Sequence, residues 1–195
     1  MARTGSAVRR TRETDIQVEL ALDGRGEANV ETGIPFFDHL LDSFSRHGLF
    51  DLVVRAKGDL QVDQHHTVED VGIVLGCALR EAVGDAAGLR RFGSARIPFA
   101  DSLLTVDLDL SNRPYFIWNV SLSRDWVGGF DAALCEDFLY AFASNGGVDL
   151  HVNRVYGHNV HHVVEGIFKG LGRALDQATS LDPRIQGALS TKGSL

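Results

Sequence analysis

The chain has 195 residues, of which 44% are hydrophobic and 23% are charged, and this composition is globular rather than disordered. Its net charge of −7 argues against a nucleic-acid partner, because general nucleic-acid binding needs a basic surface. The polar N-terminus lacks the apolar core of a signal peptide, and no apolar run is long enough to span a bilayer. We therefore expect a cytoplasmic protein with no membrane partner.

The first half of the chain predicts strands and helices in alternation. Apolar and polar residues alternate early with the period of a half-buried strand, and a glycine turn follows. After Pro35, apolar residues recur at helical spacing as far as Gly48, the expected end of a helix. The predicted elements are strands over 16–22, 27–32 and 51–56 and helices over 36–48 and 67–83.

The second half predicts a similar order of elements. Alternating aspartate and apolar residues indicate a strand, and two further segments have the apolar spacing of amphipathic helices. The last residues are mostly polar and include Pro183 and two glycines, which favours an ordered or semi-ordered extension. The predicted elements are strands over 97–110, 113–122 and 148–155, helices over 131–144 and 161–179, and a tail over 181–195.

The two halves are also similar in sequence. Residues 36–59 align with residues 134–157, so that Gly48 falls on Gly146, and HHTVEDVGIVLGCALREAV then aligns with HHVVEGIFKGLGRALDQAT. The predicted fold class is α+β, with internally duplicated βαβ-like halves that each have a sheet with helices packed on one face. We expect a single catalytic domain over 1–195, made of repeats at about 9–93 and 94–180 followed by the tail.

A His-His-x-x-Glu motif begins the long helix of each half. His65 and Glu69 are four residues apart and share a helix face, whereas His66 lies about 100° further round the helix. Adjacent histidines therefore suit two different metal ions. Imidazole and carboxylate ligands without thiolates favour Mn²⁺, although Zn²⁺ or Fe²⁺ also suit them. The alignment pairs eight candidate ligands: His39, His65, His66, Glu69, Asp137, His161, His162 and Glu165.

On the residues alone, three kinds of protein remain open. A metal-dependent enzyme acting on a small phosphorylated substrate uses all the motifs. A dinuclear hydrolase of phosphate esters or amides suits the same ligands, and a metal-storage protein needs only the histidines. A nucleic-acid module is disfavoured by the negative charge.

Several longer motifs resemble one enzyme family. FFDHLLDSFSRHG, GDLQVDQHHTVEDVGI, RRFGSA, SNRPY, NVHHVVEGIFK and STKG resemble the imidazoleglycerol-phosphate dehydratases of histidine biosynthesis, from about Arg9 to Gly193. The resemblance implies a hydro-lyase that converts D-erythro-imidazoleglycerol phosphate to imidazole acetol phosphate with two Mn²⁺ per active site, other divalent metals being possible. It also implies a homo-oligomer, a 24-subunit octahedral shell with sites built between neighbours.

The resemblance assigns roles to individual residues. It places the metal ions on the same eight ligands, and it places the substrate phosphate near basic side chains and the STKG motif. A carboxylate must act as general base; we favour Glu165, with Glu69 and Glu13 as further catalytic candidates and Asp101 as a weaker one. The implied substrate contacts are Glu13, His39, His47, His65, Glu69, Arg91, Arg113, His161, Glu165, Lys169, Ser190, Thr191 and Lys192.

The adjacent histidines also suggest how chains assemble. Because His65 and His66 point apart, we expect one site to draw ligands from more than one subunit. On this hypothesis, removal of the metal disperses the oligomer.

Overall fold

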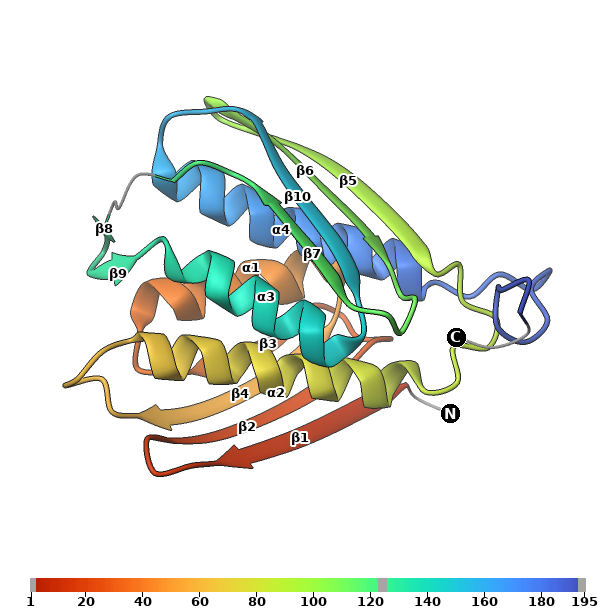
Figure 1. Ribbon diagram of the computed structural model, residues 1–195, viewed down its shortest axis with the longest axis horizontal. Helices are drawn as coiled ribbons and strands as arrows, with labels where there is room; N and C mark the ends of the chain where they lie inside the picture. The colour runs from red at the N-terminus through yellow and green to blue at the C-terminus, as the bar shows by residue number, and fades with distance from the viewer. Residues whose placement is uncertain (1–2, 123–125, 193–195) are drawn as a thin grey trace.

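The computed structural model describes residues 3–122 and 126–192 (Figure 1). Its first half is a four-stranded sheet with two helices, in the strand order β1-β2-β4-β3. β1, β2 and β4 are antiparallel neighbours, whereas β3 runs parallel to β4 with α1 as the connection between them. The elements are β1 (Thr4–Arg10), β2 (Thr14–Ala21), β3 (Ala28–Glu31), α1 (Pro35–Gly48), β4 (Asp51–Gly58) and α2 (His65–Val83).

The second half has the same topology, with the strand order β5-β6-β10-β7. β7 is parallel to β10 and α3 connects them, as α1 connects β3 to β4. The short hairpin β8–β9 is an addition with no counterpart among the described residues of the first half. The elements are β5 (Phe92–Phe99), β6 (Ser102–Asp109), β7 (Tyr115–Asn119), β8 (Trp126–Val127), β9 (Phe130–Asp131), α3 (Leu134–Gly146), β10 (Asp149–Tyr156) and α4 (Val160–Thr179).

The helices lie between the two sheets (Figure 1). α1 and α2 contact the first sheet, α3 and α4 contact the second, and the two helix layers meet as the pairs α2–α3 and α1–α4. Each sheet is therefore covered on one face. Burial follows the strand period, since Ile16, Val18 and Leu20 are buried and the residues between them are exposed. The predicted fold class, two βαβ-like halves with helices on one face, is confirmed.

Glycines allow the two helix layers to approach closely. A Cβ atom at Gly76 on α2 would overlap the backbone carbonyl of Phe142 on α3, and a Cβ at Gly172 on α4 would overlap that of Phe44 on α1. Gly76 and Gly172 are matched residues of the long helices, and Phe142 and Phe44 are matched residues of the short ones. The duplication therefore extends from the sequence to the packing of the core.

The structure differs from the predicted elements in three places. β1 was not predicted, because it is an edge strand whose residues are mostly exposed and show no apolar alternation. The segment 97–110 was predicted as one strand, but it contains the end of β5, a turn at Ala100 with φ 49°, and β6. The helix predicted from residue 131 begins at Leu134, because Phe130 and Asp131 pair in the β8–β9 hairpin.

The C-terminal tail is attached to the segment that joins the two halves. Ala188 pairs with Ala87 and Leu181 pairs with Leu89 in isolated β-bridges, and the tail is described as far as Lys192. The expected Gly193 of the STKG motif lies outside the described residues. Among the helices that the structure describes, none has both the length and the hydropathy to cross a membrane.

Candidate metal centre and substrate pocket

One cluster of imidazoles and a carboxylate forms where α4 begins beside α1. His161 and Glu165 lie one turn apart on α4, with His161 Nε2 2.9 Å from Glu165 Oε2. His39 of α1 reaches the same carboxylate oxygen through its Nε2 at 3.2 Å. One ligand atom from each of the three side chains lies within 4.8 Å of the others, which is the spacing of groups that share a metal ion.

Lys169 extends this cluster by a further helical turn. Its Nζ lies 2.8 Å from the second oxygen of Glu165 and 3.7 Å from the centre of the Phe99 ring. Burial alone would raise the pKa of Glu165, but hydrogen bonds with Lys169 and His39 outweigh burial and lower the pKa to about 2. The carboxylate is therefore ionised at neutral pH, although the residue is only 7% exposed.

A matching cluster forms where α2 begins beside α3, so each cluster takes side chains from both halves. His65 Nε2 on α2 lies 3.5 Å from Glu69 Oε2, and His65 Nδ1 lies 3.5 Å from Asp137 Oδ2 on α3. These residues are the counterparts of the first cluster in the aligned repeats. This second cluster is more open, since the Glu69 side chain is 45% exposed.

The second histidine of each motif contacts an aspartate that belongs to neither cluster. His66 Nδ1 lies 3.1 Å from both carboxylate oxygens of Asp59, and this hydrogen bond raises the pKa of His66. His162 Nδ1 lies 2.7 Å from Asp101 Oδ1. Hydrogen bonds from His162 and from the backbone amides of Asn159 and His158 lower the pKa of Asp101 well below its usual range. The structure therefore separates His66 and His162 from the two clusters of their own chain.

The residues expected to hold a phosphate surround a cavity beside the C-terminal tail. The cavity has a volume of about 620 Å³ and is lined by Arg91, Arg113, Ser190, Thr191 and Lys192, among others. Arg91 pairs through Nη2 with Asp109 Oδ2 at 2.7 Å, and this contact raises the pKa of its guanidinium. Arg91 Nη1 also donates to the carbonyl oxygen of Leu189 at 2.8 Å, which fixes the tail against the second sheet.

The phosphate cavity and the imidazole clusters lie at opposite ends of the helices. The backbone N–H of Arg91 donates to the carbonyl oxygen of Ala178 in the last turn of α4, whereas His161 lies in its first turn. At 1.5 Å per residue, α4 separates these two points by about 26 Å. A single chain therefore does not bring its clusters and its phosphate cavity together.

His47 and Lys169 lie between these two ends. His47 is in the last turn of α1 and lines a cavity of about 520 Å³ together with Arg46, Arg173 and Asp176. Burial lowers the pKa of His47, and the charges of Lys169 and Arg173 lower it further. We call the region formed by Arg46, His47, Lys169 and Arg173 the basic zone. Arg46 and Arg173 were not among the substrate contacts expected from the sequence.

Comparison with known proteins identifies the family. A family model described as imidazoleglycerol-phosphate dehydratase matches residues 32–175, which is more than half of the chain. The chain belongs to the imidazoleglycerol-phosphate dehydratase family. It is 53% identical over 195 residues to the imidazoleglycerol-phosphate dehydratase of Geobacter sp. strain M21, with all of both chains covered. It is 50% identical over the same length to that of Acetivibrio thermocellus, again with both chains fully covered.

Solved structures of dehydratases share this fold. The enzyme from Staphylococcus aureus superposes with a TM-score of 0.83 at 34% identity, covering 92% of this chain and 99% of the other. The Pyrococcus furiosus dehydratase in complex with (S)-C348 gives a TM-score of 0.82 at 37% identity, covering 96% and 99%. The family makes this chain a hydro-lyase of histidine biosynthesis that acts on a phosphorylated imidazole.

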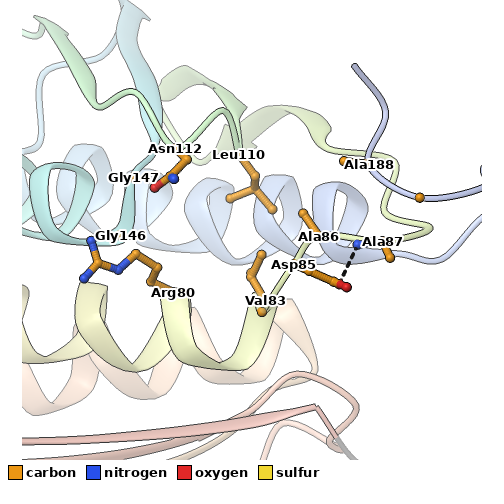
Figure 2. Close-up of a pocket in the computed structure, with 12 residues that line it drawn as sticks. Arg80, Val83, Asp85, Ala86, Ala87, Leu110, Asn112, Gly146, Gly147 and Ala188 are labelled. Carbon is orange, nitrogen blue, oxygen red and sulfur yellow. Dashed lines mark hydrogen bonds between the residues drawn. The ribbon is translucent and has the colours of Figure 1, made fainter. Parts of the chain in front are cut away.

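Another cavity lies apart from the candidate metal ligands, although Asn112 of the SNRPY motif lines it. It has a volume of about 470 Å³ and lies where α2 and α3 end, with Arg80, Val83, Leu110 and Asn112 around it (Figure 2). None of the candidate metal ligands lines this cavity. Because α2 begins with His65 and ends at Val83, this cavity lies at the other end of the helix from the imidazole clusters.

Sequence reasoning missed Asp59 and gave Asp101 only a minor role. Asp59 follows β4, seven residues before His66, in a segment without a helix or strand pattern, whereas Asp101 lies in the β5–β6 turn, 61 residues before His162. One signal was available for Asp101. The two β-hairpins align with Thr14 on Ser102, and this register places Glu13 on Asp101.

Proposed function

We propose that the chain dehydrates D-erythro-imidazoleglycerol phosphate to imidazole acetol phosphate, using two Mn²⁺ ions per active site or another divalent metal. The observation that carries this proposal is the pair of repeat-related clusters, each with a histidine and a glutamate one helical turn apart. We further propose that residues 1–195 form a single catalytic domain, with repeats at about 9–93 and 94–180 and a tail at 181–195, and that it works in the cytoplasm.

The donor atoms fit a divalent cation of intermediate hardness. His39, His161 and Glu165 offer two ring nitrogens and a carboxylate oxygen within 4.8 Å of one another. A bound cation supplies Lewis acidity that lowers the pKa of a substrate imidazole and favours electron flow into the ring. The proposed ligands are His39, His65, His66, Glu69, Asp137, His161, His162 and Glu165.

A carboxylate removes the carbon-bound proton in the proposed reaction. The electrons of the broken C–H bond form a C=C bond, and the neighbouring hydroxyl takes up a proton and leaves as water. The resulting enol loses its O–H proton and takes up a proton on carbon to give the ketone. Glu165 is our first choice for the base because two imidazoles orient it, and Glu69 and Glu13 are the other catalytic candidates. Lys169 holds the Glu165 carboxylate from the side opposite the imidazoles.

Basic side chains hold the substrate phosphate in this proposal. Arg91, Arg113 and Lys192 converge on one cavity, and Ser190 and Thr191 add hydroxyl donors. His47 and Lys169 approach from the basic zone of α1 and α4. The other proposed substrate contacts are Glu13, His39, His65, Glu69, His161 and Glu165.

The separation within one chain supports a shared active site. Because about 26 Å of helix lies between His161 and the phosphate cavity, the cavity of one chain must meet the clusters of another to hold one small substrate. We propose that the chain is a homo-oligomer, a 24-subunit octahedral shell. The second histidines, His66 and His162, then complete the metal sites across subunit contacts.

Metal removal is expected to disperse this assembly. Treatment with a chelator takes away ions that join ligands from different chains, so sedimentation velocity should show smaller species that re-form when Mn²⁺ is added. A sedimentation profile unchanged by complete metal removal would show that the metals lie within single chains.

Product analysis tests the reaction itself. Metal-free protein is incubated with imidazoleglycerol phosphate, and Mn²⁺ is then added. We expect activity to return with the metal, a ketone to form and no inorganic phosphate to appear. Release of inorganic phosphate would instead identify the dinuclear hydrolase, and metal uptake with no turnover would identify a storage protein.

A further inference from the structure

Each repeat has an acidic residue at the tip of its first hairpin. β2 and β6 correspond at an offset of 88 residues, and the same offset relates Glu13 to Asp101. The duplication therefore placed a carboxylate near the second histidine of the motif in both halves. The contacts that these two carboxylates make are nevertheless different.

Asp101 is bound to its histidine. Its Oδ1 accepts from His162 Nδ1 at 2.7 Å, and its Oδ2 accepts from the backbone N–H groups of His158 at 2.7 Å and Asn159 at 3.0 Å. The carboxylate thus joins the β5–β6 hairpin to the start of α4. Phe99 also packs against the His162 ring, with the ring centres 5.2 Å apart.

Glu13 does not form a hydrogen bond with the equivalent histidine, His66, which bonds to another carboxylate. Its Oε2 lies 3.8 Å from His66 Nδ1, which is too far for a hydrogen bond. Asp59, at the end of β4, contacts His66 Nδ1 with both oxygens at 3.1 Å. In the aligned repeats Asp59 falls on Gly157, which has no carboxylate, and the next residue, His158, gives Asp101 a backbone N–H instead.

These contacts determine which ring nitrogen can bind a metal. An ionised carboxylate only accepts hydrogen bonds, so the Nδ1 atoms of His66 and His162 carry the protons. The lone pair of each ring is then on Nε2, and a neutral imidazole with a fixed tautomer is what a divalent cation binds. His39 and His161 differ, since each places its Nε2 against Glu165.

We propose that Asp101 and Asp59 are positioning residues, which fix the tautomer and orientation of His162 and His66, respectively. Because Asp59 bonds to His66, the Glu13 carboxylate is available to contact the substrate. This assignment of roles to Asp101, Asp59 and Glu13 rests on the proposed function and refines it. Asp101 is then a positioning residue and not a base, although it corresponds in the repeat to a catalytic candidate.

Mn²⁺ binding measured by calorimetry on metal-stripped protein tests the role of Asp101. Asp101→Ala should weaken one class of Mn²⁺ sites by about 10- to 100-fold, as loss of a partner that orients a histidine ligand does. In a His162→Ala background the same substitution should cause no further loss, because Asp101 acts through that ring. Asp101→Asn keeps an oxygen for His162 and should lose less affinity. Asp15→Ala, an exposed change on the first sheet, is the control.

Three results would overturn the proposal. The first is an Asp101→Ala variant with wild-type Mn²⁺ affinity, or an Asp59→Ala variant with wild-type affinity if Asp101→Ala does not fold. The second is an equal loss in the wild-type and His162→Ala backgrounds, which would show that Asp101 acts independently. The third is Glu13→Gln weakening Mn²⁺ binding as Asp59→Ala does, since Glu13→Gln should lower kcat and leave metal affinity unchanged. Wild-type protein that binds no Mn²⁺ would instead count against the proposed function.

Discussion

Glu165→Gln is expected to lower kcat for dehydration by about 10²- to 10⁴-fold, the range in which general acid–base catalysis contributes. Glutamine keeps the size of the side chain but cannot take a proton, and it lacks the charge that His39, His161 and Lys169 now share. Steady-state rates with saturating Mn²⁺ measure the effect. A variant with more than a tenth of the wild-type kcat would exclude Glu165 as the base.

A lower kcat of Glu165→Gln can be assigned to loss of the base only if the variant keeps its fold and its bound Mn²⁺. Glu165 is nearly buried beside Lys169, and removal of one member of a buried pair leaves the other charge uncompensated. Circular dichroism, sedimentation and the amount of bound Mn²⁺ should therefore accompany the rates. Glu19→Gln, an exposed change on β2, is a suitable control because its side chain lies on the outer face of the first sheet. Rates that fall only because Mn²⁺ is lost would assign Glu165 to metal binding.

Mixing two inactive variants is expected to restore activity. Glu165→Gln damages the cluster at the start of α4, and Arg113→Ala damages the phosphate cavity. If each site combines the cluster of one chain with the cavity of another, random co-assembly of equal amounts leaves about a quarter of the sites intact. The chains are separated with chelator, mixed and reassembled with Mn²⁺, and the rate is then compared with that of wild type.

A matched mixture provides the control. Glu165→Gln and His161→Ala both damage one cluster of a single chain, in which the two side chains lie 2.9 Å apart. Their mixture should stay as inactive as either variant alone, because no chain in it supplies an intact cluster. Equal recovery in both mixtures, or recovery in neither, would contradict a site divided between clusters and cavities of different chains.

The fold and the two clusters were predictable because both depend on short-range periodicity. Four residues make about one helical turn, so the pairs His65–Glu69 and His161–Glu165 follow from spacing alone. Aligning the repeats then indicated His39 and Asp137, which the structure places at those two pairs. Apolar periodicity likewise indicated all four helices, since each buries one face.

The remaining features depend on tertiary contacts that no local periodicity indicates. β1 is an edge strand with mostly exposed residues, so it shows no apolar alternation. The phosphate cavity joins Arg91, at the end of the first repeat, to Leu189 of the C-terminal tail, and no local pattern relates them. Asp59 reaches His66 only because β4 ends beside the first turn of α2. Such contacts are fixed by tertiary packing rather than by local propensity.

The distance between the first and last turns of α4 has a consequence for how turnover scales with dilution. An enzyme whose site lies within one chain loses activity in proportion to its concentration. When clusters and cavity come from different chains, mass action also lowers the fraction of chains that hold a complete site. The apparent reaction order in protein should therefore rise above one at concentrations where the chains separate.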